Sequence, residues 1–198
     1  MSISEMRTPV NILDFVESED SVFEWRKKIQ VWAKVEHQTY NSIFSKHGVT
    51  AKSVKITMRK HSGLTLHNAL STAEYGHLVI SDIDRDTPGF FVLSAAMVEP
   101  VTCKAERTQT VMGQNNRPVI EALTPLVFPG YLTEKYLRQV QEEPMSYSES
   151  RYILLTPKPI ALETGGLVYI GGFPCEVVIP HELDMYRNEY EVVRRFDN

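Results

Sequence analysis

The residues that come nearest to a catalytic arrangement are a cysteine and a histidine six positions apart, Cys175 and His181. A thiolate beside an imidazole can act as a nucleophile, and Glu176 and Glu182 flank the pair. However, Cys175 alternates with Val177 on one face of an expected strand, which is typical of an ordinary buried core cysteine. We therefore expect no catalytic residue, and an enzyme that uses Cys175 and His181 is the alternative from a different functional class.

The sequence also lacks the usual patterns of metal-binding and phosphate-binding sites. The six histidines show no ligand spacing and no CxxC is present, whereas a structural zinc site requires about four close ligands. Neither GxxxxGK[ST] nor GxGxxG occurs, so Gly165-Gly166 and Gly171-Gly172 are interpreted as hairpin turns. The sequence predicts no metal and no cofactor.

Charge is distributed unevenly along the first third of the chain. Residues 1–24 hold one cation, Arg7, against six carboxylates, and residues 26–60 hold nine cations against Glu36 alone. This distribution favours contacts between copies or pairing within one copy, although a lysine-rich solvent face would explain the basic block equally well. The net charge of −4 predicts no general attraction to nucleic acids or membranes.

Two tryptophans flank the basic block, and they would suit base stacking or the anchoring of a protein interface. The neighbouring acidic segment counts against nucleic acid. Aromatic and charged side chains of this block and of a turn-rich acidic loop are the candidate interface residues: Trp25, Arg26, Lys27, Lys28, Trp32, Lys46, Asp84, Arg85 and Asp86.

The elements that would position these residues are mostly strands. Apolar and polar residues alternate over 28–36 and 54–59, and further short apolar runs are separated by turn sequences such as Asp84–Gly89. A chain of 198 residues with 42% hydrophobic residues can fold as one ordinary domain or two small ones. Two distant cysteines, no signal pattern and no membrane-length apolar run indicate synthesis in a reducing cytosol.

The order of elements predicts two halves. Residues 52–98 and 148–196 follow a similar succession of strands and turns, which indicates a tandem repeat. The polar segment 104–117 is interpreted as a linker between a β module at 1–103 and a second one at 118–198. Within the second module, apolar residues with helical spacing predict one short helix over 130–143. The expected fold is mainly β, with two small antiparallel barrels or sandwiches in tandem.

Four motifs in the first half resemble the head–tail joining proteins of tailed bacteriophages. They are Trp25–Glu36 (WRKKIQVWAKVE), then KITMRK at 55–60 with LTLHNAL at 64–70, and GHLVISDI at 76–83. The resemblance covers roughly residues 10–100. Members of that family are usually half this length, and the segment 40–49 has no counterpart that we can match.

The resemblance implies a structural virion protein without catalytic residues, forming a homo-oligomeric ring between portal and tail as a head closure or stopper. Its implied partners are further copies of the chain, the portal or adaptor protein, and tail proteins. The protein would lie near the DNA in the channel without binding a specific sequence, and it would contact no membrane. Its implied location is the virion neck, and the host cytoplasm during assembly. A tail-completion or tail-terminator ring is the alternative within the same class, and a stand-alone ligand-binding barrel also stays open.

Overall fold

The computed structural model describes residues 3–38, 52–113, 117–134, 151–182 and 184–195. Apart from a 3-10 helix at Ile3–Glu5, the elements among these residues are strands, so the expected mainly β class is confirmed. No helix among them is long and apolar enough to cross a membrane. The strands are β1 (Thr8–Glu19), β2 (Val22–Gln38), β3 (Ser53–Arg59), β4 (Ala69–Thr72), β5 (Gly76–Asp84), β6 (Phe90–Met97), β7 (Val101–Met112), β8 (Pro118–Glu134), β9 (Arg151–Pro157), β10 (Leu167–Ile170), β11 (Phe173–Glu182) and β12 (Arg187–Arg194).

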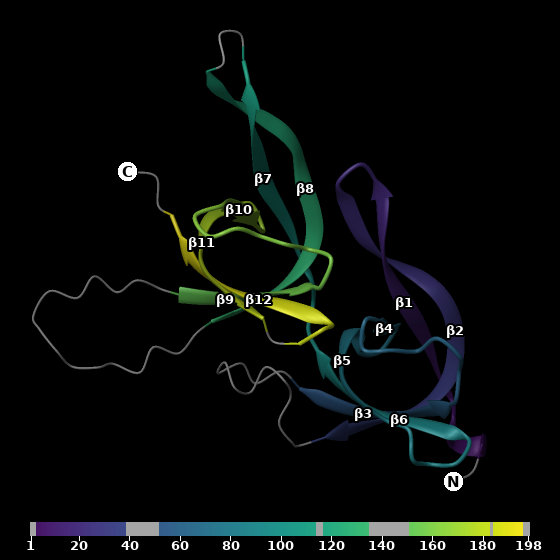
Figure 1. Cartoon of the computed structure of the whole chain (residues 1–198). Coiled ribbons are helices and arrows are strands. Elements are labelled where there is room, and N and C mark those ends of the chain that lie inside the picture. The colour runs from purple at the N-terminus through teal and green to yellow at the C-terminus, as the bar shows by residue number, and fades with distance from the viewer. Residues whose placement is uncertain (1–2, 39–51, 114–116, 135–150, 183, 196–198) are drawn as a thin grey trace, which may run out of the picture.

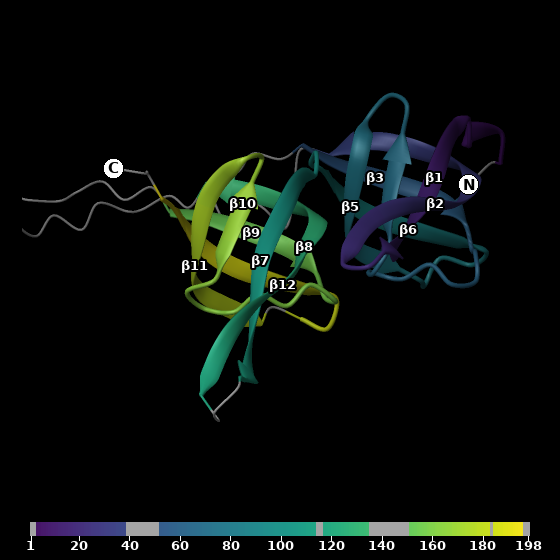
Figure 2. The same ribbon diagram turned by 90° about the horizontal axis from the view of Figure 1, so that it is seen from above.

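Strands β1 to β6 close into a six-stranded antiparallel barrel, which we call the N-terminal barrel (Figures 1 and 2). The pairing runs β1–β4–β5–β6–β3–β2, and the β1–β2 hairpin completes the circle. Because the sheet closes on itself, each strand has a pairing partner on both sides, and this removes a common route to aggregation.

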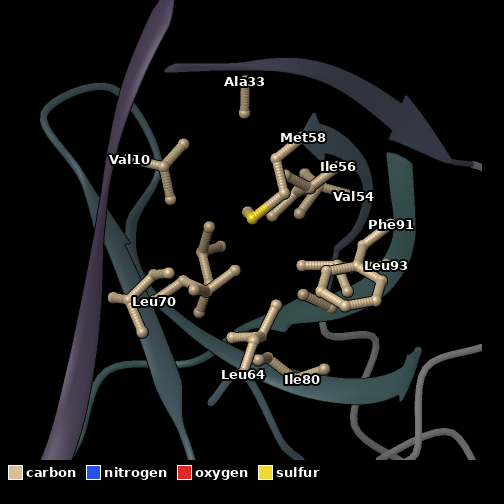
Figure 3. Packing of buried hydrophobic residues seen from close by; sticks show 13 residues of the cluster. Val10, Ala33, Val54, Ile56, Met58, Leu64, Leu70, Ile80, Phe91 and Leu93 are labelled. Carbon is tan, nitrogen blue, oxygen red and sulfur yellow. The ribbon is translucent and has the colours of Figure 1, made fainter. Parts of the chain in front are cut away.

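Apolar side chains from all six strands fill the barrel. Val10 of β1, Ile56 of β3 and Leu70 of β4 are inaccessible to solvent and point toward one another in Figure 3. Complete burial of a residue of this size contributes about 1.5–3 kcal/mol. The barrel therefore has its own hydrophobic core.

Six further strands, β7 to β12, lie outside the N-terminal barrel and form what we call the C-terminal ring. Their pairing runs β8–β7–β10–β11–β12–β9, and β8 pairs with β9. Each pairing of β1 to β6 thus recurs six strands later. The repeat of strand order expected from the sequence is present in the pairing, and its low sequence identity explains why only the pattern was visible.

The two groups of strands share buried surface. Val22 of β2 pairs in parallel with Val127 of β8, and this pairing joins all twelve strands into one sheet. A small apolar cluster lies across the junction, where Val79 and Ala96 of the barrel meet Tyr131 of the ring. The division into domains at 1–103 and 118–198 stays a prediction, because each group has a core while this third cluster is common to both.

The expected linker at 104–117 is wrong in its local structure. Residues 104–112 belong to β7, whose base alternates buried Cys103 and Ala105 with exposed Lys104 and Glu106. Small inward residues made this alternation inconspicuous in the sequence. The rest of the segment is polar because that part of the strand is surrounded by solvent.

The helix expected over 130–143 is contradicted for its first residues, and residues 135–143 lie outside the described part of the chain. Tyr131 to Glu134 continue β8 and pair with β9. Gly130 fits only because it has no side chain, since a Cβ atom there would lie 2.9 Å from Cys103 Sγ. Pairing with β9 therefore overrides the local helical spacing.

Candidate interaction surfaces

Cys175 and His181 do not form a reactive pair. Both lie on β11, but a β-bulge between Val177 and Ile179 changes the side of the strand on which later residues lie. Cys175 is buried in the core of the ring, and this burial raises the pKa of its thiol. His181 Nε2 lies instead 3.2 Å from Glu191 Oε1. A protonated, enclosed thiol gives the enzyme alternative no support.

No group of three or more histidine, cysteine, aspartate or glutamate side chains that could hold a metal ion occurs among the described residues.

The cationic candidates on β2 are largely engaged along their own hairpin. Arg26 forms an ion pair with Glu24 at 2.6 Å, and Lys28 forms one with Asp14 at 2.9 Å. Lys27 Nζ donates a hydrogen bond to Gln30 Oε1. Of the three explanations for the uneven charge, pairing within one copy therefore accounts for Arg26 and Lys28.

The remaining candidates are scattered. Asp84 accepts a hydrogen bond from the Asp86 backbone amide, and the Arg85 guanidinium lies over the ring of Phe91. Asp84 is the last residue of β5, Arg85 and Asp86 follow it, and all three are exposed. Lys46 lies outside the described residues.

Trp25 lies at the junction between the barrel and the ring, where it is partly buried. Its indole centroid is 5.7 Å from the His77 ring, and His77 Nε2 lies 2.8 Å from the Tyr131 hydroxyl oxygen. Burial lowers the pKa of His77 to about 4, although the nearby Glu99 carboxylate opposes that shift. Burial also raises the pKa of the Tyr131 hydroxyl, while the cationic Arg187 opposes it. These rings join the two halves, so Trp25 already has a packing role within the chain.

Trp32 is the exposed tryptophan, with 61% of its surface open to solvent. It lines a groove of about 630 Å³ at the start of the β1–β2 hairpin, which we call the Trp32 groove. The side chains lining this groove are Met6, Arg7, Val31, Trp32, Arg59, Lys60 and His61. The floor is largely apolar and the charged members of the lining are all basic.

The opposite end of the same hairpin carries carboxylates. We call the turn at Glu17–Ser21 the acidic tip, and Glu19 and Asp20 in it have no ion-pair partner among the described residues. Ser21 is the only described residue other than glycine with positive φ, at 67°. Its amide donates to Glu17 Oε1, and its carbonyl accepts a hydrogen bond from the Val127 amide of β8.

A further apolar surface feature was not predicted from the sequence. The distal halves of β7 and β8, residues 107–112 and 118–123, project beyond the ring (Figures 1 and 2). We call this hairpin the β7–β8 arm. Its exposed apolar side chains are Met112, Val119, Ile120 and Leu123. The run Val119-Ile120, which follows a polar segment, was the available signal in the sequence.

Within the arm, the two strands pair only with each other among the described residues. The neighbouring strand β10 pairs with β7 at Cys103–Ala105, and β9 pairs with β8 from Tyr131 onward. An isolated two-stranded hairpin is marginally stable in water. The arm therefore combines two open strand edges with exposed apolar side chains on both of its faces.

Comparisons with family models, with curated proteins and with solved structures found no match to this chain.

Proposed function

We propose that this chain is a structural protein that works by assembling with further copies of itself, and that the β7–β8 arm is its main adhesive element. The observation that carries this proposal is the exposure of Ile120 and Met112, which are 73% and 70% open to solvent on an unsupported hairpin. Apolar surface of this kind on a protruding element is typical of a protein interface.

The energetics favour covering the arm. Burial of one large aliphatic side chain contributes about 1.5–3 kcal/mol, so Met112, Val119 and Ile120 together supply a substantial driving force for association. The two open edges also offer backbone donors and acceptors to a neighbouring strand. Inside one chain, the described residues provide no such neighbour for the distal arm.

The more specific form of the proposal is a ring at the head–tail junction of a tailed bacteriophage, as head closure or stopper between portal and tail. Its support is the resemblance over roughly residues 10–100. The motif at Trp25–Glu36 lies on β2, KITMRK coincides largely with β3, and GHLVISDI lies on β5. These motifs therefore belong to one closed barrel, as expected of a shared structural unit.

The test of self-association is a light-scattering and native mass-spectrometry series over rising protein concentration. We expect the parent chain to form a defined oligomer, and Ile120→Asp to weaken association at least about tenfold by placing a charge in the interface. Met185→Asp is the matched control, since Met185 is also largely exposed but lies away from the arm. A parent chain that stays monomeric throughout would overturn the proposal.

The virion part needs its own experiment. Purified phage particles should contain the chain, and particles made without it should hold packaged DNA but no attached tail. Absence of the chain from purified virions would contradict the connector assignment and would leave self-association untouched.

A further inference from the structure

The Trp32 groove offers hydrogen-bond donors to a ligand. Arginine and lysine side chains donate only, the indole of Trp32 donates only, and His61 donates when protonated or through one nitrogen when neutral. Among the described residues, no acidic side chain lines the groove. An occupant that satisfies these groups must be rich in acceptors and negatively charged, as a set of carboxylates or phosphates is.

The donors are largely free to bind such an occupant. Arg59 and His61 have no side-chain partner among the described residues, and Arg7 uses only Nε, which donates to the Ser4 carbonyl. Lys60 is the exception, because its Nζ donates to the Arg85 carbonyl at 2.7 Å. Two guanidinium groups remain available, and their planar form suits paired contacts to a carboxylate.

The chain itself carries a complementary group. Glu19 and Asp20 of the acidic tip are exposed and lack ion-pair partners among the described residues, whereas Glu24 and Asp14 nearby are already paired. The tip is also held in place, because Ser21 is bound by β8 through Val127 and by the guanidinium of Arg107. An anchored tip loses little conformational freedom on binding, which reduces the cost of association.

Tip and groove cannot meet within one molecule. They lie at opposite ends of the β1–β2 hairpin, since the register pairs Thr8 with Ala33 at the groove end and Glu19 with Val22 at the tip. With a rise of about 3.4 Å per residue, these ends are roughly 35–40 Å apart. Figure 1 shows the β1–β2 hairpin running from the N-terminal end of the barrel to the turn between β1 and β2.

We infer that the acidic tip of one copy docks into the Trp32 groove of the next copy. The contact joins two different surfaces, so each copy uses its tip on one neighbour and its groove on the other. Such a head-to-tail contact closes into a ring when the rotation between copies allows it. The inference rests on the proposed self-association and adds the partner surface and its charge chemistry, which are separate from the apolar arm.

The apolar floor of the groove should make this contact stronger than an ordinary surface ion pair. Exposed ion pairs contribute about 0–1 kcal/mol each, because water screens them. Met6, Val31 and Trp32 provide an apolar surface beneath the cations. Docking of the tip excludes water there, and charge pairs strengthen as the local dielectric falls.

The test uses two charge-reversed chains and their mixture. The tip variant is Glu19→Arg with Asp20→Arg, and the groove variant is Arg7→Glu with Arg59→Glu. We expect each alone to associate at least about tenfold more weakly than the parent, because like charges then face each other. Mixing the two restores association in alternating order, since every contact is again between opposite charges.

The matched control for the tip variant is Glu106→Arg with Glu163→Arg, which makes the same change of net charge as that variant at exposed positions outside the tip. It should associate as the parent does. Thermal unfolding followed by circular dichroism checks that each variant folds. Association of the parent should also weaken from about 0.1 M to about 1 M salt, as the screening length falls from about 10 Å to about 3 Å.

The outcomes separate this inference from the proposed function. Loss of assembly in Ile120→Asp without any effect of the charge reversals would overturn the tip-and-groove contact while leaving self-association in place. Failure of the mixture to regain assembly would overturn the contact as well. If the groove variant assembles normally but loses binding to a single-stranded oligodeoxynucleotide that the parent retains, the groove serves nucleic acid and the inference is wrong.

Discussion

At the scale of single residues, the junction between barrel and ring is an environment in which titratable side chains are buried. His77 is buried beside Trp25 and Tyr131, where water cannot solvate an imidazolium ion. Arg187 lies at the same junction, where burial lowers its pKa, and it donates a hydrogen bond to the Ile80 carbonyl across the two halves. Polar side chains thus connect the halves, and each brings a desolvation cost that its partners offset.

His77 makes the stability of the protein depend on pH. Its pKa is about 4 in the folded state against an ordinary value of 6.5, so the unfolded chain binds this proton first as pH falls. The contribution of neutral His77 to the free energy of unfolding is fully present above pH 6.5. It is lost as pH falls from 6.5 toward 4, and the loss has a limit of about 3 kcal/mol.

Urea unfolding at several pH values measures this loss. His77→Gln should show a smaller decrease over the same window, because glutamine keeps a polar contact to Tyr131 but does not titrate. Equal pH dependence in the parent and in His77→Gln would show that other groups cause the effect.

At the scale of elements, the success of the sequence analysis depended on how regular each strand is. The alternation at 54–59 predicted β3, and Gly171-Gly172 predicted the β10–β11 hairpin, where both glycines have positive φ as a two-residue turn requires. Strand β1 was not predicted from the sequence, because its carboxylates were interpreted only as part of an acidic segment. Its pattern of Val10, Ile12 and Leu13 also breaks at a bulge.

The interaction surfaces were less predictable than the strands. Both tryptophans were named as interface candidates, and the sequence could not show that Trp32 is exposed whereas Trp25 is partly buried at the junction of barrel and ring. The apolar arm was hidden for a similar reason, since Val119 and Ile120 resemble any core segment until the strand is seen to extend past its neighbours. Exposure depends on contacts between distant segments, and no local pattern encodes it.

Ile56 tests the packing of the N-terminal barrel. It is inaccessible to solvent in the middle of β3, so Ile56→Ala should lower the free energy of unfolding by about 2–5 kcal/mol. Lys55→Ala on the outer side of the same strand should change it by less than about 0.5 kcal/mol. Denaturant titration provides both values, and a similar small loss for the two variants would mean that the barrel interior is not closely packed.

At the scale of the whole molecule, the question is whether barrel and ring unfold together. Each has its own apolar core, which would allow independent unfolding. Against this, Val79 and Ala96 of the barrel share a buried cluster with Tyr131 of the ring, and the β2–β8 pairing connects the two groups. Because breaking the junction exposes this surface and leaves polar groups without partners, we expect one cooperative transition.

Trp25 can report on the junction directly. The chain has two tryptophans, so Trp32→Phe leaves the junction indole as the single tryptophan. Below the concentration at which copies associate, its fluorescence and the far-ultraviolet circular dichroism should change at the same denaturant concentration. Tyr131→Ala in this background removes a buried ring, costs about 3–5 kcal/mol and should separate the two transitions. Tyr169→Ala on β10, outside the shared cluster, should leave them coincident. A fluorescence change that precedes the loss of strand signal in the parent background would show that the junction opens first and that the two halves are independent folding units.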